Sequence, residues 1–173
     1  MFKNIRYWLQ KKLLSIPTPT APKPGPILDH SVELVQEFER CRLKAYQDGG
    51  GVWTCGWGST KDVTEGTVWT QDHADAVFLE DIAWVEDCID ENVTVPLIQP
   101  EYDALCSLIF NIGCPAFKKS TLLKHVNNLD MDLAAQQFAP WNKQTNKRTG
   151  RLEVVDGLTA RRKAEKELFE RSA

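Results

Sequence analysis

A run of closely spaced prolines divides this chain and limits where its folded domain begins. Residues 16–28 read IPTPTAPKPGPIL, and five of the nine prolines fall between positions 17 and 26. Proline lacks a backbone N–H and fixes φ, so such a run favours extended polyproline II structure over helix or sheet. We therefore expect a semi-rigid linker over 16–28 and a single folded domain over 29–173.

The segment before the linker, residues 1–15, has the pattern of a short basic amphipathic helix. Its apolar run is too short to cross a bilayer, and it lacks the continuous apolar core of a secretory signal peptide. Two interpretations stay open. Either residues 1–27 contact an anionic membrane or envelope surface, or the helix docks on its own domain or frays. The apolar residues at helical spacing are Phe2, Ile5, Leu9 and Leu13.

The charge of the chain is split at the same place as its prolines. The whole chain has 21 Lys and Arg against 24 Asp and Glu, a formal net charge of −3. Residues 1–28 hold five basic residues and no acid, which leaves 16 basic and 24 acidic residues, a net −8, in the remainder. Because nucleic-acid binding requires a basic surface, we expect no nucleic-acid partner for this acidic domain.

Hydrophobic periodicity predicts that the domain is mostly helical. One exception lies near its start, where two short segments flank Asp48-Gly49-Gly50-Gly51 and predict a small β-hairpin over 43–57. The expected fold is therefore α+β and two-lobed, with the sheet confined to one small lobe beside a larger helical lobe. Helices are expected at 31–40, 70–89, 99–112, 121–127, 130–138 and 158–170.

The cysteines and histidines carry no metal or redox signature. Five cysteines are present without any C-x-x-C pair, and the three histidines are scattered, so we expect no metal, no cofactor and no Cys/His nucleophile. Cys106 falls on an apolar helical face and is expected to be buried. Cys88 with Cys114 is one candidate disulfide. The sequence leaves open the pairing of Cys41, Cys55, Cys88, Cys106 and Cys114.

The stretch from 37 to 60, EFERCRLKAYQDGGGVWTCGWGST, places carboxylates on two different elements. Glu39 closes the first helix, Asp48 lies in the hairpin turn, and Thr54 lies on the second strand among aromatic residues. Glycosidic cleavage needs one protonated carboxyl for the leaving oxygen and one ionised carboxylate to activate water or stabilise positive charge. From spacing alone, Glu39 is equally an exposed helix residue and Asp48 an ordinary turn residue.

The same stretch resembles the catalytic signature of the phage T4-type lysozymes, or endolysins, of glycoside hydrolase family 24. That signature is a Glu, eight residues, an Asp or Cys, five residues and a Thr, which Glu39, Asp48 and Thr54 match. The resemblance covers roughly residues 31–170, and its many ordered blocks argue against coincidence. The blocks that resemble the family's helical lobe are 99–105, 110–113, 120–123, 157–162 and Glu165.

The resemblance implies hydrolysis of the β-1,4 bond between N-acetylmuramic acid and N-acetylglucosamine in bacterial peptidoglycan. Glu39 would protonate the glycosidic oxygen. Asp48 would activate or orient water, or stabilise the oxocarbenium-like charge, and Thr54 would help position that water. The family pattern also implies inversion of the anomeric centre, which requires room for water between the carboxylates.

Three further residues are weaker candidates for substrate binding. Phe110 and Asn111 either line the cleft opposite the hairpin or, for Phe110, pack in the core. Arg161 or its neighbour Arg162 either sits near Glu39 or binds acidic groups of the substrate. The alternative for both arginines is a solvated helix face paired with Glu165 at i+3 or i+4.

The sequence departs from the family at Arg40, where the family usually has Gly directly after the catalytic Glu. An arginine here either favours the ionised form of Glu39 and weakens it as an acid, or points away, since adjacent helical residues face different directions. A second departure, Trp57-Gly58-Ser59-Thr60 at the close of the hairpin, is expected to be peripheral to catalysis.

Together these observations predict a monomeric phage endolysin that degrades peptidoglycan during host lysis. Without a recognisable export signal, the chain is expected in the host cytoplasm until a holin-type pore releases it to the wall. The alternative is a non-catalytic peptidoglycan-binding domain with a membrane-active N-terminal helix. Because a pure binding domain has no need for Glu39, Asp48 and Thr54 together, the catalytic interpretation is favoured.

Overall fold

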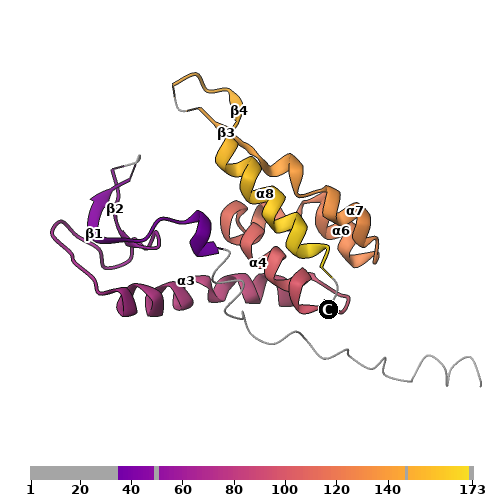
Figure 1. Ribbon diagram of the computed structural model, residues 1–173, viewed down its shortest axis with the longest axis horizontal. Coiled ribbons are helices and arrows are strands. Elements are labelled where there is room, and N and C mark those ends of the chain that lie inside the picture. Colours follow the sequence, from indigo (N-terminus) through magenta and orange to yellow (C-terminus); the bar gives the residue numbers. More distant parts are fainter. Residues whose placement is uncertain (1–34, 49–50, 147, 172–173) are drawn as a thin grey trace, which may run out of the picture.

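The computed structural model describes residues 35–48, 51–146 and 148–171, so the predicted helix at 1–15 and linker at 16–28 lie outside the described residues. Two lobes are joined by one long helix, α3 (Gln71–Asn92), which begins beneath the small lobe and ends in the large one (Figure 1). No helix among the described residues is long and apolar enough to cross a membrane.

The small lobe is built on an antiparallel hairpin of β1 (Arg42–Gln47) and β2 (Trp53–Gly56), as predicted. Tyr46 pairs with Thr54 across the two strands, and the register shifts between Arg42 and Tyr46. A third extended segment lines the free edge of β1, where the Trp69 amide donates to the Leu43 carbonyl at 2.8 Å. Backbone hydrogen bonds on both edges therefore hold β1 in place.

The turn after β2 fastens the small lobe to α3. The indole Nε1 of Trp57 donates to Asp75 Oδ1 at 2.6 Å, and the Ser59 hydroxyl donates to Asp81. Gly56 has φ +62°, and a Cβ there would lie 2.8 Å from the Trp69 ring, so this position requires glycine. Residues 57–60, where the sequence departs from the family, therefore attach the small lobe to α3.

α3 follows the predicted periodicity closely. Its N-cap is Thr70, whose hydroxyl accepts from the His73 amide, and such a cap satisfies a backbone donor that the helix leaves unpaired. Its buried face repeats every three or four residues, as a helix packed on one side requires. The buried residues are Ala74, Phe78, Ile82, Val85, Cys88 and Ile89.

The large lobe surrounds α4 (Gln99–Ile112), whose residues from Tyr102 through Ile109 are all buried. The C-terminal helix α8 (Asp156–Phe169) packs along α4, and the shorter helices cover the rest of the core (Figure 1). Those shorter elements are α5 (Cys114–Lys118), α6 (Thr121–Asn127), α7 (Met131–Gln136) and the 3-10 turn η1 (Ala139–Trp141).

A disulfide joins Cys88 of α3 to Cys114 of α5, with Cα atoms 6.0 Å apart. The candidate pairing is therefore confirmed, and Cys41, Cys55 and Cys106 are free thiols. Cys106 is fully buried in α4, as predicted. Burial raises the pKa of the Cys106 thiol, so it behaves as a small apolar side chain.

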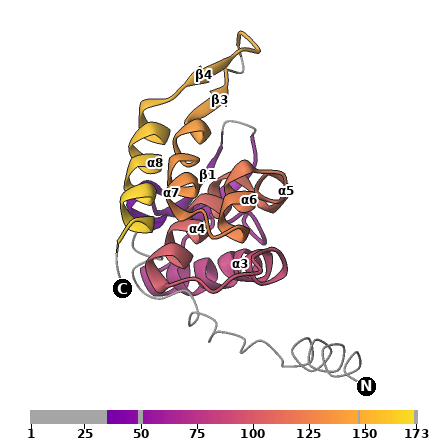
Figure 2. The same ribbon diagram turned by 90° about the vertical axis from the view of Figure 1, so that its right-hand side faces the viewer.

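A second hairpin rises from the large lobe, so the expectation of a sheet confined to the small lobe is wrong. Its strands, β3 (Lys143–Thr145) and β4 (Leu152–Val154), pair antiparallel, with Gln144 opposite Glu153. All six strand residues are exposed. Both hairpins project on the same side of α3 (Figures 1 and 2). The predicted mostly helical, two-lobed α+β fold is nevertheless confirmed.

Candidate active site

Glu39 directly follows the short helix at 35–38 and precedes β1 in the chain, and its side chain reaches Arg161 of α8. Its amide donates to the Val35 carbonyl at 3.0 Å, which closes the last helical turn. Its carboxyl Oε1 accepts from Arg161 Nη1 at 2.7 Å, and its side chain is 31% exposed. The carboxyl is thus both held by a cation and accessible to a ligand.

Arg161 is buried, with its side chain only 4% exposed, and its other nitrogens have protein partners. Nε donates to Glu165 at 3.2 Å, and Nη2 donates to the Ser107 carbonyl at 3.2 Å. The guanidinium carbon also lies 5.6 Å from the centre of the Phe38 ring. The alternative of a solvated helix face is therefore wrong, although its Glu165 pairing is present.

Glu165 and Arg162 complete what we call the buried ionic cluster, made of Ser107, Arg161, Arg162 and Glu165. Oε1 of Glu165 accepts from Arg162 Nη2 at 2.7 Å and from the Ser107 hydroxyl at 2.7 Å. Burial raises the pKa of Glu165, while Arg162, Ser107 and Arg161 act in the opposite direction. Burial likewise lowers the pKa of Arg162.

Asp48 and Thr54 are held at the turn end of the β1–β2 hairpin by the same residue, Val52. Asp48 Oδ1 accepts from the Val52 amide at 2.9 Å, and the Thr54 hydroxyl donates to the Val52 carbonyl at 3.1 Å. Such side-chain to backbone bonds are typical of Asp and Thr at turns. Thr54 is buried, at 4% exposure, whereas Asp48 is exposed. The structure therefore brings these two predicted residues together across the turn.

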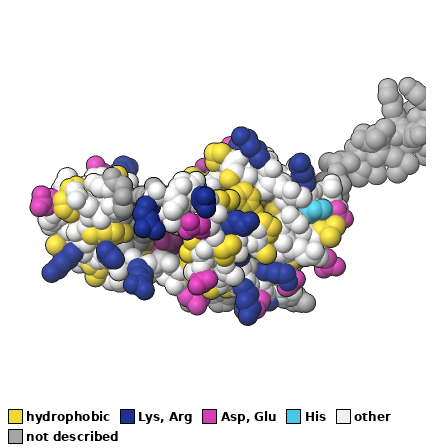
Figure 3. All heavy atoms as spheres, turned by 90° about the horizontal axis from the view of Figure 1, so that it is seen from above, with side chains coloured by type: hydrophobic (Ala, Val, Ile, Leu, Met, Phe, Trp, Pro, Cys, Tyr) yellow, Lys and Arg dark blue, Asp and Glu magenta, His cyan; other side chains and the backbone are white. Residues whose placement is uncertain are grey.

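Arg40 is exposed and lies after the helical turn that Glu39 closes. The cation hydrogen-bonded to Glu39 is Arg161 from α8, 122 positions along the chain. Basic and acidic side chains gather on the surface where the small and large lobes meet (Figure 3).

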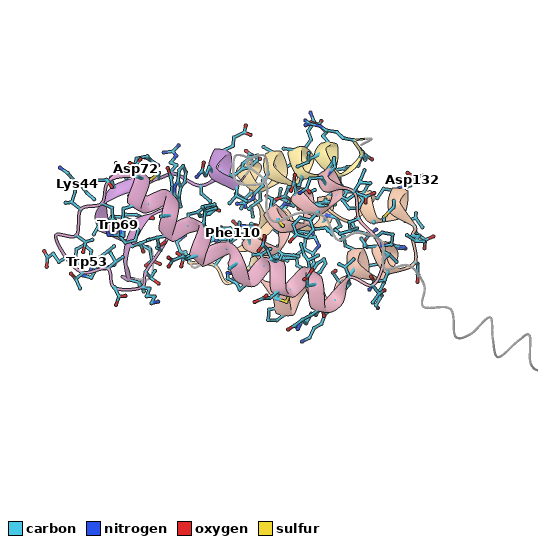
Figure 4. The ribbon with its side chains drawn as sticks, turned by 90° about the horizontal axis from the view of Figure 1, so that it is seen from below. Lys44, Trp53, Trp69, Asp72, Phe110 and Asp132 are labelled. Carbon is cyan, nitrogen blue, oxygen red and sulfur yellow. A yellow bond between two sulfur atoms is a disulfide. The ribbon has the colours of Figure 1, made fainter. Side chains whose placement is uncertain are left out.

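Phe110 and Asn111 end α4 in different surroundings. Phe110 is half-buried and packs edge-on against Phe78, with ring centres 5.6 Å apart, and stacks on Trp84 at 6.5 Å. It lies beside α3, away from the labelled residues of the small lobe (Figure 4), which favours core packing. Asn111 is exposed and lines a pocket of about 300 Å³. Its other lining residues are Ile112, Trp141, Lys143, Gln144 and Leu158.

Sequence reasoning missed Ser107 as a site residue. It named Glu165 among the blocks that resemble the family and as a surface partner of the arginines, but did not place it in the site. The available signal was the R-R-x-x-E spacing on α8 combined with a serine inside the apolar stretch of α4. Across the described part of the chain, no group of three His, Cys, Asp or Glu side chains is placed to hold a metal ion.

Comparisons with known proteins identify the family of the chain. The family profile described as phage lysozyme matches residues 36–165. The chain is 45% identical over 144 residues to an endolysin of Acyrthosiphon pisum secondary endosymbiont phage 1, covering 83% of this chain and 97% of that protein. It is 40% identical over 148 residues to the endolysin of Salmonella phage P22, with the same coverages.

A solved structure gives the same result for the fold. The muramidase domain of SpmX from Asticaccaulis excentricus superposes with a TM-score of 0.79 at 36% identity, covering 84% of this chain and 98% of that one. The chain therefore belongs to the phage lysozyme family, and it is a glycoside hydrolase of the muramidase type that acts in host lysis.

Proposed function

We propose that this chain hydrolyses the β-1,4 bond between N-acetylmuramic acid and N-acetylglucosamine with Glu39 as the general acid. Glu39 protonates the glycosidic oxygen as the bond to the sugar breaks. Asp48 activates or orients the attacking water, or stabilises the oxocarbenium-like charge, and Thr54 positions that water. Attack from the opposite face of the sugar inverts the anomeric centre.

The observation that carries the proposal is the 2.7 Å bond from Arg161 Nη1 to Glu39 Oε1. It fixes one oxygen of the carboxyl, so the proton to be donated sits on Oε2. When Glu39 releases that proton, the arginine stabilises the negative charge that forms, without having to move. A carboxyl held in this way is suited to proton transfer at one defined place.

The hairpin supports the roles of the other two residues. The hydrogen of the Thr54 hydroxyl is donated to the Val52 carbonyl, so its oxygen presents lone pairs that can accept from a water molecule. The Val52 amide holds the Asp48 carboxylate in a fixed position. Two groups that share one backbone anchor keep a constant separation, which suits the positioning of a single water.

The substrate is assigned to the surface between the lobes, with Asn111 and the pocket it lines as one contact for the glycan. The near-complete burial of Arg161 supports a role beside Glu39 in place of direct substrate binding. For Phe110, the contacts with Phe78 and Trp84 support a packing role.

Glu39→Gln tests the acid, because glutamine keeps the shape of the side chain and cannot donate the proton. We expect clearing of a peptidoglycan suspension to slow by about 10²–10⁴-fold, the usual contribution of a general acid. Glu37→Gln is the matched control, an exposed acid two residues away. Clearing by the Glu39→Gln variant at the wild-type rate would overturn the assignment of the acid.

The stereochemistry is tested on the same reaction. Proton NMR of freshly cleaved glycan should show the α-anomer at the new reducing end before mutarotation mixes the two forms. A β-anomer at early times would indicate retention and would assign Asp48 to a covalent step instead.

The narrower assignment to the T4-type lysozymes of glycoside hydrolase family 24 is part of the same proposal. It is supported by the spacing of Glu39, Asp48 and Thr54 in the sequence. A non-catalytic peptidoglycan-binding role is not favoured, because the chain keeps all three residues and an anchored arginine.

The cellular setting that we propose is also based on the sequence. The chain acts as a monomer on peptidoglycan, without nucleic acid, and waits in the host cytoplasm for holin-type release. Residues 1–27 contact an anionic membrane or envelope surface through their excess positive charge. Replacing Lys3, Arg6, Lys11 and Lys12 by Gln should abolish sedimentation with anionic vesicles and leave clearing of isolated peptidoglycan unchanged.

A further inference from the structure

The buried ionic cluster gives Arg161 a fixed orientation toward Glu39. Three separate nitrogens of one planar guanidinium are used: Nε on Glu165, Nη2 on the Ser107 carbonyl and Nη1 on Glu39. Because the guanidinium is rigid, two buried acceptors determine its plane, and Nη1 then points in one direction only. The position of the Glu39 carboxyl thus depends on groups that lie behind Arg161.

Glu165 is the central acceptor of this arrangement. It is fully buried, and its Oε1 alone accepts from Ser107, Arg161 and Arg162, at 2.7, 3.2 and 2.7 Å. A buried carboxylate with so many donors is retained at a high desolvation cost. Ordinary packing in this interior does not require it, since an apolar side chain of similar volume would fill the same space.

Charge also connects the cluster to Glu39. Arg161 contacts two carboxylates, Glu165 in the interior and Glu39 at the lobe boundary, while Arg162 contacts Glu165. Removing the carboxylate at 165 would remove the negative charge that balances Arg161 and Arg162, while Arg161 stays bonded to Glu39. The extra positive charge would favour the ionised form of Glu39, which is the form that cannot act as an acid.

We propose that Glu165, together with Ser107, is a positioning residue for the general acid: it anchors the Arg161 guanidinium and thereby sets the place and the charge balance of the Glu39 carboxyl. This inference rests on the proposed role of Glu39. It adds a residue of α8 and a residue of α4, neither of which touches substrate, to the machinery that keeps the acid competent.

The test is the pH dependence of clearing by the full-length Glu165→Gln variant. The alkaline limb of the pH–activity profile reports loss of the acid's proton, and we expect it to move to lower pH by about one unit or less. Glu165→Asp keeps the charge and should leave the limb where it is in wild type. Glu167→Gln is the control, an exposed acid on the same helix paired only with Lys163 among the described residues.

A merely structural role would lower activity equally at every pH and leave the limb in place, and that result would overturn the proposal. An equal shift in Glu167→Gln would overturn it as well. Should Glu165→Gln fail to fold, Ser107→Ala removes only one donor to Glu165 and should move the limb in the same direction by less; an unmoved limb there contradicts the proposal. Wild-type activity in Glu39→Gln would refute the assignment of Glu39 as the acid. That result is distinct from the outcomes above, which test only the positioning role of Glu165.

Discussion

The indole of Trp57 donates a 2.6 Å hydrogen bond to Asp75 and so ties the end of the β1–β2 hairpin to the helix that joins the lobes. Gln71 donates to the same carboxylate oxygen at 2.8 Å, and the neighbouring Ser59 donates to Asp81, about 1.7 turns further along α3. Polar contacts at several points along one helix fix the orientation of the small lobe and hence of Asp48 and Thr54.

Trp57→Phe should lower the free energy of unfolding by about 1.5–3 kcal/mol, because it removes a donor to a charged acceptor and keeps most of the ring. Urea denaturation measures the change. Glu80→Gln, an exposed acid on α3, should stay within about 0.5 kcal/mol of wild type. Equal stability of Trp57→Phe and wild type would show that this hydrogen bond does not hold the lobe.

Loss of the Cys88–Cys114 disulfide should destabilise the large lobe. The closed loop spans 26 positions, which corresponds to about 3.5 kcal/mol in the chain-entropy estimate. The double variant Cys88→Ala/Cys114→Ala should therefore unfold at a lower urea concentration than oxidised wild type. Wild type treated with a reductant should have the same urea midpoint as the double variant. Cys41→Ser, which changes a free thiol, should have the same urea midpoint as wild type when no reductant is present. Reductant that leaves the wild-type midpoint unchanged contradicts this prediction.

Arg161→Lys should lower kcat by about 10- to 100-fold and leave KM nearly unchanged. Lysine keeps the charge, but it cannot present the planar fork that reaches Glu39, Glu165 and Ser107 together. Initial rates on soluble glycan fragments measure both constants. Lys163→Gln, an exposed change on the same helix, is the control. A kcat within twofold of wild type would mean that charge alone suffices at this position.

The stability cost of ionised Glu165 should vary with pH. Burial raises its pKa above the ordinary 4.5, so the folded state binds more protons than the unfolded state in the window above that value. The contribution of Glu165 to stability is then full below pH 4.5 and is lost as the pH rises through the folded-state pKa. Glutamine mimics the protonated form of Glu165. The free energy of unfolding of Glu165→Gln, taken relative to that of wild type, should therefore be higher at pH 7 than at pH 4. Urea denaturation at both pH values measures the difference, and a constant difference would refute this account.

Much of the fold could be predicted because its helices carry strong periodicity. The predicted helix at 121–127 coincides with α6, and the helix expected to begin at Thr70 begins one residue later. The second hairpin escaped prediction because its strands bury no side chain, so Leu152 and Val154 leave no alternation against a core. The short helix α5 lies between a glycine of φ +82° and Lys119, too brief for a repeat to show.

The same distinction holds for the candidate site, where some residues could be predicted from local sequence and others depend on the packing of distant helices. The positions of Glu39, Asp48 and Thr54 on a helix end, a turn and a strand follow from local sequence. The cluster behind Arg161 does not, because an i, i+4 pair such as Arg161 and Glu165 has the same spacing on a solvated helix as in an interior. Only the packing of α8 on α4 puts that pair against Ser107 and out of water.

The β3–β4 hairpin has a practical consequence. The described residues of its turn, Asn146 and Arg148 to Arg151, are held by local bonds such as that from Asn146 to Glu153, and none of them belongs to the core. Backbone of this kind tolerates insertion, since the added chain displaces no buried contact. A fluorophore or a grafted peptide at this turn would therefore be displayed at the rim of the pocket that Lys143 and Gln144 line, which is the pocket proposed above as a contact for the glycan.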